Sequence, residues 1–414
     1  MQVVMVVGIV VVVCLVALVI CGLHWYLWRR LVRDTTARGS AARYLGTAVL
    51  VAGPVLLIGA FVAERAGLAF LLIQLIAWPG YMWGALLVYL VLWLLAAEPV
   101  RPLLRWWLSR GDDAAERAEP TPVAANAVPG PSAPAEPPAP VSRRLFVSRV
   151  VGGAAGLAAV TTVGYGTYGV LAGPRVKRLA VPLANLPRAA HGYRIAVVSD
   201  IHLGPILGRG FAERVVETIN GTQPDLIAVV GDLVDGSVEH LRSAVEPLSR
   251  LRARHGAYFV TGNHEYFSGA EQWIDHVQEL GLRLLANSRT ELPHFDLAGV
   301  NDVQGERIGQ GPDFAAALAD RDLARTAVLL AHQPVQIHDA VEYGVDLQLS
   351  GHTHGGQIWP GNLVAGLANP TVAGLERYGD TQLYVTRGAG AWGPPVRVGA
   401  PSDITVIELA SARA

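Results

Sequence analysis

The chain contains little cysteine and little charge. Cys14 and Cys21 are the only cysteines among its 414 residues, and both lie in the first apolar run. A disulfide framework is therefore excluded, and so is a cysteine-based zinc site in the rest of the chain. Charged residues make up 16% of the sequence and the formal net charge is −1. No basic field is present that would recruit nucleic acid, so no nucleic acid binding is expected.

Hydrophobic residues reach 51%, and the excess is concentrated near the N-terminus. A helix needs roughly 20 apolar residues to cross a bilayer. The region 1–97 has three uncharged runs of suitable length, at residues 3–28, 44–62 and 68–97. A cleaved signal peptide is disfavoured because no basic segment precedes the first run. The third run contains Pro79-Gly80, so it is either one kinked span or a re-entrant turn followed by a span; its short connection to the second run favours one span.

Arginines in the connecting segments predict the orientation of these spans. Five arginines lie between the first two runs, within residues 29–43, and four more follow the third run, within residues 101–117. Because basic loops stay in the cytoplasm, both segments are expected inside and the N-terminus outside. The sequence therefore predicts a multi-pass protein of the cell membrane, embedded in the lipid bilayer.

Residues 98–149 are predicted to be a cytoplasmic linker rich in proline and alanine. Eight prolines fall between Pro120 and Pro140, a composition that cannot bury a core. The linker ends in SRRLFVSR, which resembles a twin-arginine export motif, and a mildly apolar stretch follows at residues 150–172. These arginines are either an export signal for the twin-arginine machinery or a basic segment that flanks a span on its cytoplasmic side. The weakly apolar stretch favours export, with residues 150–172 as a fourth span or signal anchor and the following domain outside the cytoplasm.

Residues 173–414 alternate strand-like apolar runs with helical patterns, which predicts βαβ units and an α/β fold. Helical patterns occur at residues 210–220, 238–254 and 271–280. Further strands are expected at residues 295–300, 383–386 and 404–409. Five runs that read as buried strands each lead directly into a polar cluster, at residues 194–199, 226–230, 257–261, 326–330 and 347–350. Ligands bind at the carboxyl ends of strands in such sheets, so the five clusters are expected to converge.

The clusters supply nitrogen and oxygen donors without any thiolate. There are seven of them: Asp200, His202, Asp232, Asn263, His332, His352 and His354. Imidazole with carboxylate suits manganese, iron or zinc. Seven donors exceed the needs of one tetrahedral ion but match two ions that share one carboxylate. Two-metal hydrolytic sites hold their ions about 3.5–4 Å apart and clamp the oxygens of a phosphoryl transfer.

The motifs D-x-H, G-D-x-x-D, G-N-H-E, a later H, and G-H-x-H resemble those of the calcineurin-like metallophosphoesterases, over residues 194–409. The resemblance implies an αββα two-sheet sandwich, two divalent metal ions and metal-dependent hydrolysis of phosphoric esters. It implies that one ion binds Asp200, His202, Asp232 and His354. It implies that the second binds Asp232, Asn263, His332 and His352, with Asp232 as the bridge. His264 takes the place of the catalytic histidine, which assists the transition state or protonates the leaving oxygen.

Two further segments, GHTHGGQIWP and RGAGAWGPPVRVG, resemble the membrane-associated bacterial branch of this family. That branch comprises phosphodiesterases likened to UDP-diacylglucosamine pyrophosphatases. The resemblance implies a phosphorylated small molecule or lipid as the substrate, cleaved at a phosphodiester or pyrophosphate bond. Phosphomonoester hydrolysis on the same core, and a membrane sensor or scaffold that only binds, remain as alternatives.

Several accessory residues also have predicted roles. Asp235 and Glu265 are expected to hydrogen-bond the metal ligands, since metal-bound imidazoles and carboxylates need such partners. Arg387 and Arg397 are expected either to meet substrate phosphate or to lie on the surface. Residues 355–395 carry few strand or helix signals outside 383–386, which predicts substrate-facing loops.

Overall fold

The computed structural model of this protein describes residues 2–116 and 142–412. Most of the predicted proline-rich linker, residues 117–141, lies outside the described residues. The chain forms two compact units. One contains residues 1–55 and 86–162, and the other contains residues 56–85 and 163–414.

Among the described residues, four helices are long and apolar enough to cross a membrane: Val10–Arg33, Ala41–Ala63, Phe70–Ala97 and Arg143–Leu171. They correspond to α1 (Gln2–Leu27) with its π-helical continuation Trp28–Arg33, to α2 (Ala41–Arg65), to α3 (Phe70–Ala97) and to α5 (Arg143–Leu171). Helix α3 continues through Pro79, as the single-span interpretation predicts. Proline is tolerated in such apolar helices.

The predicted linker is helical at both of its ends. Val100–Glu116 forms α4, and α5 begins at Arg143 instead of residue 150. Helix α4 contains leucine and arginine, which favour helix, and its proline, Pro102, lies in the first turn, where its missing N–H is not needed. The twin-arginine-like residues therefore belong to the first turns of α5. At its other end, α5 leads into strand β1 through the three residues 172–174.

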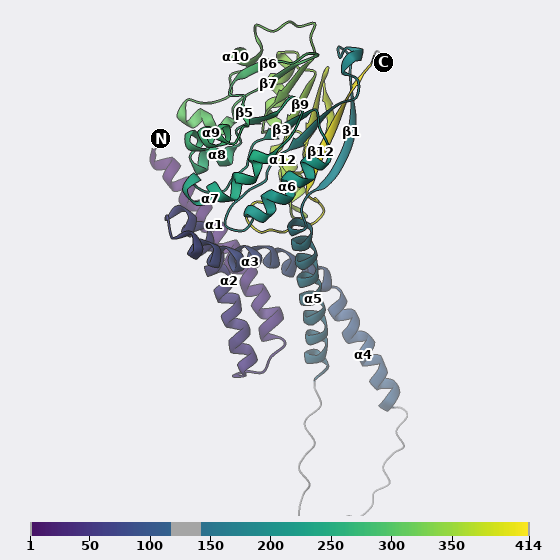
Figure 1. Cartoon of the computed structure of the whole chain (residues 1–414). Helices are drawn as coiled ribbons and strands as arrows, with labels where there is room; N and C mark the ends of the chain where they lie inside the picture. Colours follow the sequence, from purple (N-terminus) through teal and green to yellow (C-terminus); the bar gives the residue numbers. More distant parts are fainter. Residues whose placement is uncertain (1, 117–141, 413–414) are drawn as a thin grey trace, which may run out of the picture. The chain divides into compact units, whose positions relative to one another are not determined.

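The described residues of the second unit contain two six-stranded sheets (Figure 1). The first has the order β1-β12-β2-β3-β4-β5, formed by Arg175–Leu183, Asp403–Ser411, Tyr193–Val198, Leu226–Val230, Ala257–Val260 and Arg283–Leu284. The second has the order β10-β11-β9-β8-β7-β6, formed by Gly374–Tyr378, Thr381–Val385, Leu347–Ser350, Ala327–Leu330, Asp296–Gly299 and Ser288–Glu291. Strands β2 to β5 run parallel, as do β11, β9, β8 and β7. The five predicted strands that precede polar clusters are β2, β3, β4, β8 and β9.

Alternate residues of each strand face different apolar cores. One core lies between the two sheets and contains Val197 and Val230 of the first sheet with Leu330 and Leu349 of the second. The opposite face of the first sheet packs against α6 (Arg209–Gly221), α7 (Val238–Val245) and α9 (Ala270–Glu279). The outer face of the second sheet packs against α10 (Phe314–Leu318) and α11 (Ile337–Glu342). Strands buried on both faces read as continuous apolar runs. The predicted αββα sandwich is confirmed.

Two local predictions were wrong. The helix expected over residues 238–254 ends at Val245 and is followed by the 3-10 helix Glu246–Arg250. Pro247 explains the break, because it has no N–H to continue the α-helix. Residues 355–395 are also more regular than expected, since they include α12 (Gly361–Ala368) and β10.

The second unit also contains the adjoining halves of α2 and α3, Leu56–Ala85. Ala60 and Ala77 are buried there with Tyr81, and small residues of this kind allow close approach of apolar helices. The Gln74 amide donates a hydrogen bond to the carbonyl of Pro205, at 3.2 Å. These contacts join the helical hairpin to the loop that follows His202.

Candidate metal centre

The polar clusters converge at the carboxyl ends of five strands from both sheets. Asp200 and His202 follow β2, Asp232 and Asp235 follow β3, Asn263 and His264 follow β4, His332 follows β8, and His352 and His354 follow β9. Among the described residues, side chains that could hold a metal ion form three groups. Two of them, described next, approach each other at Asp232, whose Oδ2 lies 3.9 Å from His202 Nε2. The third, formed by His202, Asp235 and His264, shares His202 with the first.

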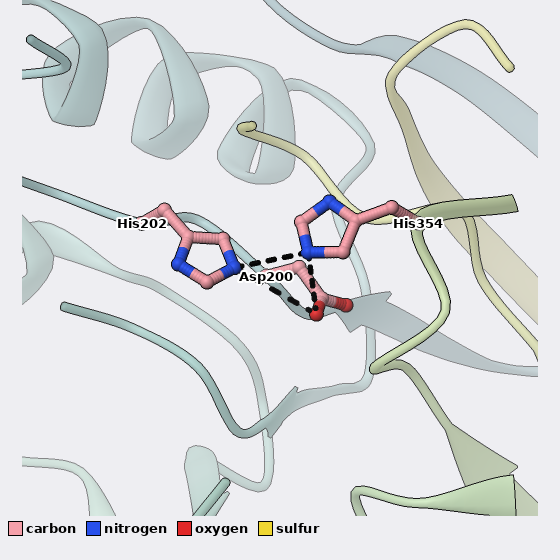
Figure 2. A group of neighbouring side chains, drawn as sticks. All are labelled: Asp200, His202 and His354. Carbon is pink, nitrogen blue, oxygen red and sulfur yellow. Dashed lines mark hydrogen bonds and ion pairs between the residues drawn. The ribbon is translucent and has the colours of Figure 1, made fainter. Parts of the chain in front are cut away.

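The first group contains Asp200, His202 and His354, whose donor atoms all lie within 4.8 Å of one another. Figure 2 shows their arrangement: the Nε2 atoms of the two histidines are 3.0 Å apart, and His354 Nε2 lies 3.3 Å from Asp200 Oδ1. Asp200 and His202 are buried. Two imidazole nitrogens that face each other beside a carboxylate form a donor set suited to a divalent transition metal.

The second group contains Asp232, His332 and His352, again within 4.8 Å. His332 Nε2 lies 3.2 Å from Asp232 Oδ2, yet this buried nitrogen makes no hydrogen bond within the described part of the chain. Asn263 Oδ1 is 2.9 Å from His352 Nδ1, which adds an amide oxygen. A buried nitrogen that makes no hydrogen bond is costly, and a metal ion beside Asp232 would use it as a ligand. The residues present therefore fit a metal.

The backbone of the centre is bent into unusual conformations. Five residues adopt φ between 49° and 71°: Asp200, His202, Asp232, His352 and His354. Such left-handed conformations are rare outside glycine and cluster at functional sites. Glycines provide the space: a Cβ atom at Gly351 would collide with Ser199 and Asp200, and one at Gly262 would collide with Asp232.

Glu265 joins two of the loops. Its buried carboxylate accepts hydrogen bonds from the backbone N–H groups of Asp232 at 3.0 Å, Leu233 at 2.7 Å and Gly262 at 2.6 Å. Burial and the nearby Asp232 carboxylate raise the pKa of Glu265 to about 7, although the backbone N–H groups oppose this. Glu265 thus fixes the loop after β3 against the loop after β4.

Asp235 contacts two histidine rings. Its Oδ1 lies 3.0 Å from His202 Nδ1 and 2.6 Å from His264 Nδ1. Burial raises the pKa of Asp235, but the charge and hydrogen bond of His202 and the hydrogen bond of His264 outweigh it and hold this pKa at about 2. A carboxylate on Nδ1 fixes the orientation of an imidazole and leaves its Nε2 available. In His202 that Nε2 faces the other two members of the first group, Asp200 and His354.

His264 borders a cleft. Its backbone N–H donates to Asp232 Oδ1 at 2.9 Å, and its Nε2 lies 4.0 Å from Asp232 Oδ2. Burial lowers the pKa of His264, but the hydrogen bond to Asp235 and the surrounding carboxylates raise it to about 9. Its ring is thereby held at the edge of the two groups, within reach of a ligand bound there.

Comparison with known proteins identifies the family of this chain. Residues 193–356 match the family described as calcineurin-like phosphoesterase. A metallophosphoesterase of Aquifex aeolicus is 32% identical over 240 residues, which cover 57% of this chain and 91% of that relative. The chain belongs to the calcineurin-like phosphoesterase family.

Two other similarities were found. A transmembrane protein with a metallophosphoesterase domain from Danio rerio is 38% identical over 262 residues, which is 60% of this chain and 60% of that protein. The match therefore spans less than two thirds of that relative. A solved dimetal phosphatase from Danio rerio aligns with a TM-score of 0.33 and 12% identity, over 52% of this chain and 91% of that one.

Arg397 contacts His354 from the side of the calcineurin-like domain that is occupied by the loops at Gly390 and Ala400. It is buried, and its guanidinium donates to the carbonyls of Gly390, His354 and Ala400 while Nη2 lies 3.1 Å from His354 Nδ1. The predicted alternative of a surface position is wrong for Arg397, because its guanidinium is buried. A contact with substrate phosphate stays a prediction. Arg387 is half-buried against Gly355.

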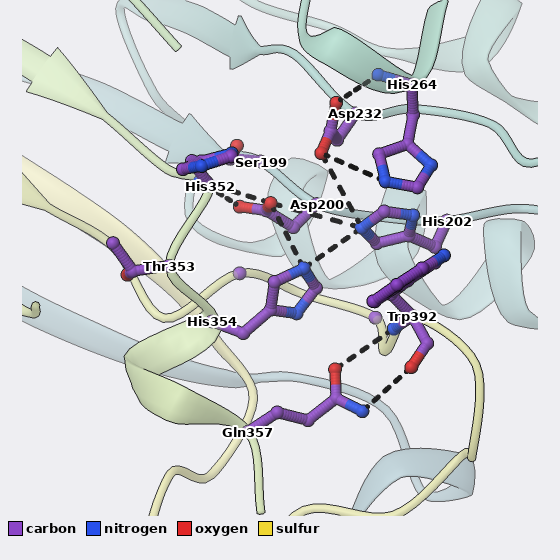
Figure 3. Close-up of polar contacts among 12 residues, drawn as sticks. Ser199, Asp200, His202, Asp232, His264, His352, Thr353, His354, Gln357 and Trp392 are labelled. Atoms are coloured by element: carbon purple, nitrogen blue, oxygen red, sulfur yellow. Dashed lines mark hydrogen bonds and ion pairs between the residues drawn. The ribbon is translucent and has the colours of Figure 1, made fainter. Parts of the chain in front are cut away.

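Sequence reasoning missed Gln357, which fixes the loop that carries Trp392. Figure 3 shows the side-chain amide of Gln357 accepting a hydrogen bond from the Trp392 N–H at 3.0 Å and donating to the Trp392 carbonyl at 2.9 Å. The Trp392 ring lies 5.6 Å from the His264 ring. Both residues fall in the family-like segments GHTHGGQIWP and RGAGAWGPPVRVG, which is the signal that could have identified them.

Proposed function

We propose that the chain is a membrane-bound, dinuclear-metal phosphoesterase that hydrolyses a phosphodiester or pyrophosphate bond in a lipid or cell-envelope substrate. The pair of adjacent histidine and carboxylate groups supports this proposal most strongly. Membership of the phosphoesterase family and the four apolar helices support a metal-dependent hydrolase at a membrane.

In this proposal Asp200, His202, Asp232 and His354 hold one ion, and Asp232, Asn263, His332 and His352 hold the other. The position of Asp232 supports its role as the bridge, since its Oδ2 lies 3.9 Å from His202 Nε2 and 3.2 Å from His332 Nε2. When bound, two ions of manganese, iron or zinc would polarise the phosphoryl oxygens and activate water.

The other side chains orient the reacting groups. His264 donates a proton from Nε2 to the leaving oxygen, as a general acid. Asp235 holds the Nδ1 side of this ring at 2.6 Å, which directs Nε2 toward the substrate. Glu265 and Arg397 position the ligands Asp232 and His354 through the hydrogen bonds described above.

Turnover by the full-length protein in detergent tests the proposal. With added manganese, bis(p-nitrophenyl) phosphate should be hydrolysed, and EDTA should abolish the reaction. Faster hydrolysis of p-nitrophenyl phosphate would instead support a phosphomonoesterase. Two bound metals per chain without turnover of either compound would support a binding protein that acts as a sensor or scaffold.

We further propose that the phosphoesterase domain lies outside the cytoplasm. The basic segments around the first three spans support a cytoplasmic position for α4, and α5 is long and apolar enough to cross once more. Replacing both Arg143 and Arg144 with lysine should then strand a C-terminal reporter in the cytoplasm while the first three spans still insert. An unchanged outside signal would remove the twin-arginine route, and an inside signal from the unmodified chain would contradict the orientation.

A further inference from the structure

A cleft of about 560 Å³ opens beside His264. Its walls are of two kinds. Asp235, Ser237, His264 and Ser268 form a polar side, and Phe61, Phe267 and Trp392 form an apolar side. The volume is within the range of roughly 300–1,000 Å³ that is usual for small-molecule sites. The cleft is therefore amphiphilic, and its polar side continues into the metal centre.

Two of the three aromatic rings, those of Phe267 and Trp392, contact the His264 ring, and the third, Phe61, contacts Trp392. The ring of Phe267 lies 5.4 Å from that of His264, and the ring of Phe61 lies 6.4 Å from that of Trp392. Their exposed fractions are 36% for Phe61, 61% for Phe267 and 50% for Trp392. Contiguous exposed apolar surface with a polar rim is typical of a binding site.

Phe61 connects this cleft to a candidate membrane span. It belongs to α2 and lies two residues before the end of the candidate span Ala41–Ala63. The end of a membrane span lies near the boundary between lipid and water. Tyr81 of α3 packs against Phe61 with ring centroids 5.2 Å apart and is buried, so the Phe61 ring is supported in place.

We propose that the cleft is a subsite for the apolar chain of an amphiphilic phosphoester. The phosphoryl group reaches the metal centre, and the chain lies against Phe61, Phe267 and Trp392 at the membrane boundary. This inference rests on the proposed function and specifies its substrate class. A phosphoester without an apolar chain would leave these three side chains in contact with water.

Binding of two phosphonates to the manganese-loaded, full-length protein in nanodiscs tests the subsite. Octylphosphonate should bind at least about tenfold more tightly than methylphosphonate, since its chain is removed from water. Calorimetric titration gives both affinities, and titration of nanodiscs without protein corrects for partitioning of the octyl chain.

Variants of the cleft should reduce this preference. Phe61→Ala and Trp392→Ala should each lower the ratio of the two affinities by roughly threefold or more, because each removes one apolar wall. Phe61→Leu keeps an apolar side chain and should retain most of the preference. Leu323→Ala removes an apolar side chain that is 72% exposed and does not line the cleft, so the ratio should stay unchanged.

Equal affinities for the two phosphonates in the unmodified protein would overturn the subsite. A preference that survives both alanine substitutions would overturn it as well. Failure of the proposed function gives a different result: the chain-length preference would remain, but no phosphoester would be hydrolysed. Metal content and melting temperature of each variant identify a protein that has failed to fold.

Discussion

The floor of the site and the cleft beside it are built in different ways. The floor consists of buried polar side chains from the ends of five strands, held in constrained backbone conformations. The cleft takes exposed aromatic side chains from α2, from α8 (Asn263–Ser268) and from the loop at Trp392. The proposed chemistry and the proposed substrate selection therefore depend largely on different side chains, even where α8 supplies both, and substitutions should affect one without the other.

The largest effect is expected from Asp232→Asn, because one carboxylate would be lost from both proposed coordination shells. Turnover should fall by more than the roughly 10²–10⁴-fold that a general acid contributes, and metal content measured by mass spectrometry should fall with it. Asp339→Asn, at an exposed position in α11, is the matched control. Full metal content with near-normal turnover would refute the bridging role.

His264→Ala lies at the border of the two regions and should have the next largest effect. Turnover should slow by roughly 10²–10⁴-fold while both metals remain bound, because the proton donor is lost and the ligands are not. His338→Ala, which alters an exposed histidine on α11, should leave turnover unchanged. If His264→Ala loses metal, His264 must be reassigned as a ligand.

Gln357→Ala should have the smallest effect, and only on the cleft. It removes the hydrogen bonds that fix Trp392, so the preference for octylphosphonate should fall by about two- to threefold, as expected for loss of a modest hydrogen bond. Metal content should not change. Gln278→Ala is a suitable control, because that amide is exposed and bonds within its own helix, to Ile274. A large loss of metal in Gln357→Ala would show that the two regions are coupled.

The floor of the site could be predicted from the sequence because its signals are local. Each of β2, β3, β4, β8 and β9 is a short apolar run followed at once by ligand-type residues. Parallel strands place those residues at their carboxyl ends, so His354 could be expected near Asp200 although 154 positions separate them. The αββα sandwich followed from the same alternation together with the resemblance.

The cleft could not be predicted, because its residues meet only through tertiary packing. Nothing near Phe61 in the sequence indicates contact with Trp392, and the hairpin contact at Pro205 joins segments 131 positions apart. Arg397 was misjudged for a related reason. Its burial depends on the carbonyls of Gly390 and Ala400, whose directions are set by a loop without any periodic pattern. The early end of α7 could have been inferred from Pro247.

The short junction between α5 and β1 limits where the domain can work. Three residues, 172–174, separate the helix from the strand, and a fully extended segment of that length spans only about 10 Å. With α5 as a membrane anchor, the domain has almost no tether and cannot search the surrounding solution. How often the domain meets its substrate would then depend on the density of substrate molecules in the bilayer. The substrate would arrive by lateral diffusion in the membrane and not by diffusion from bulk water.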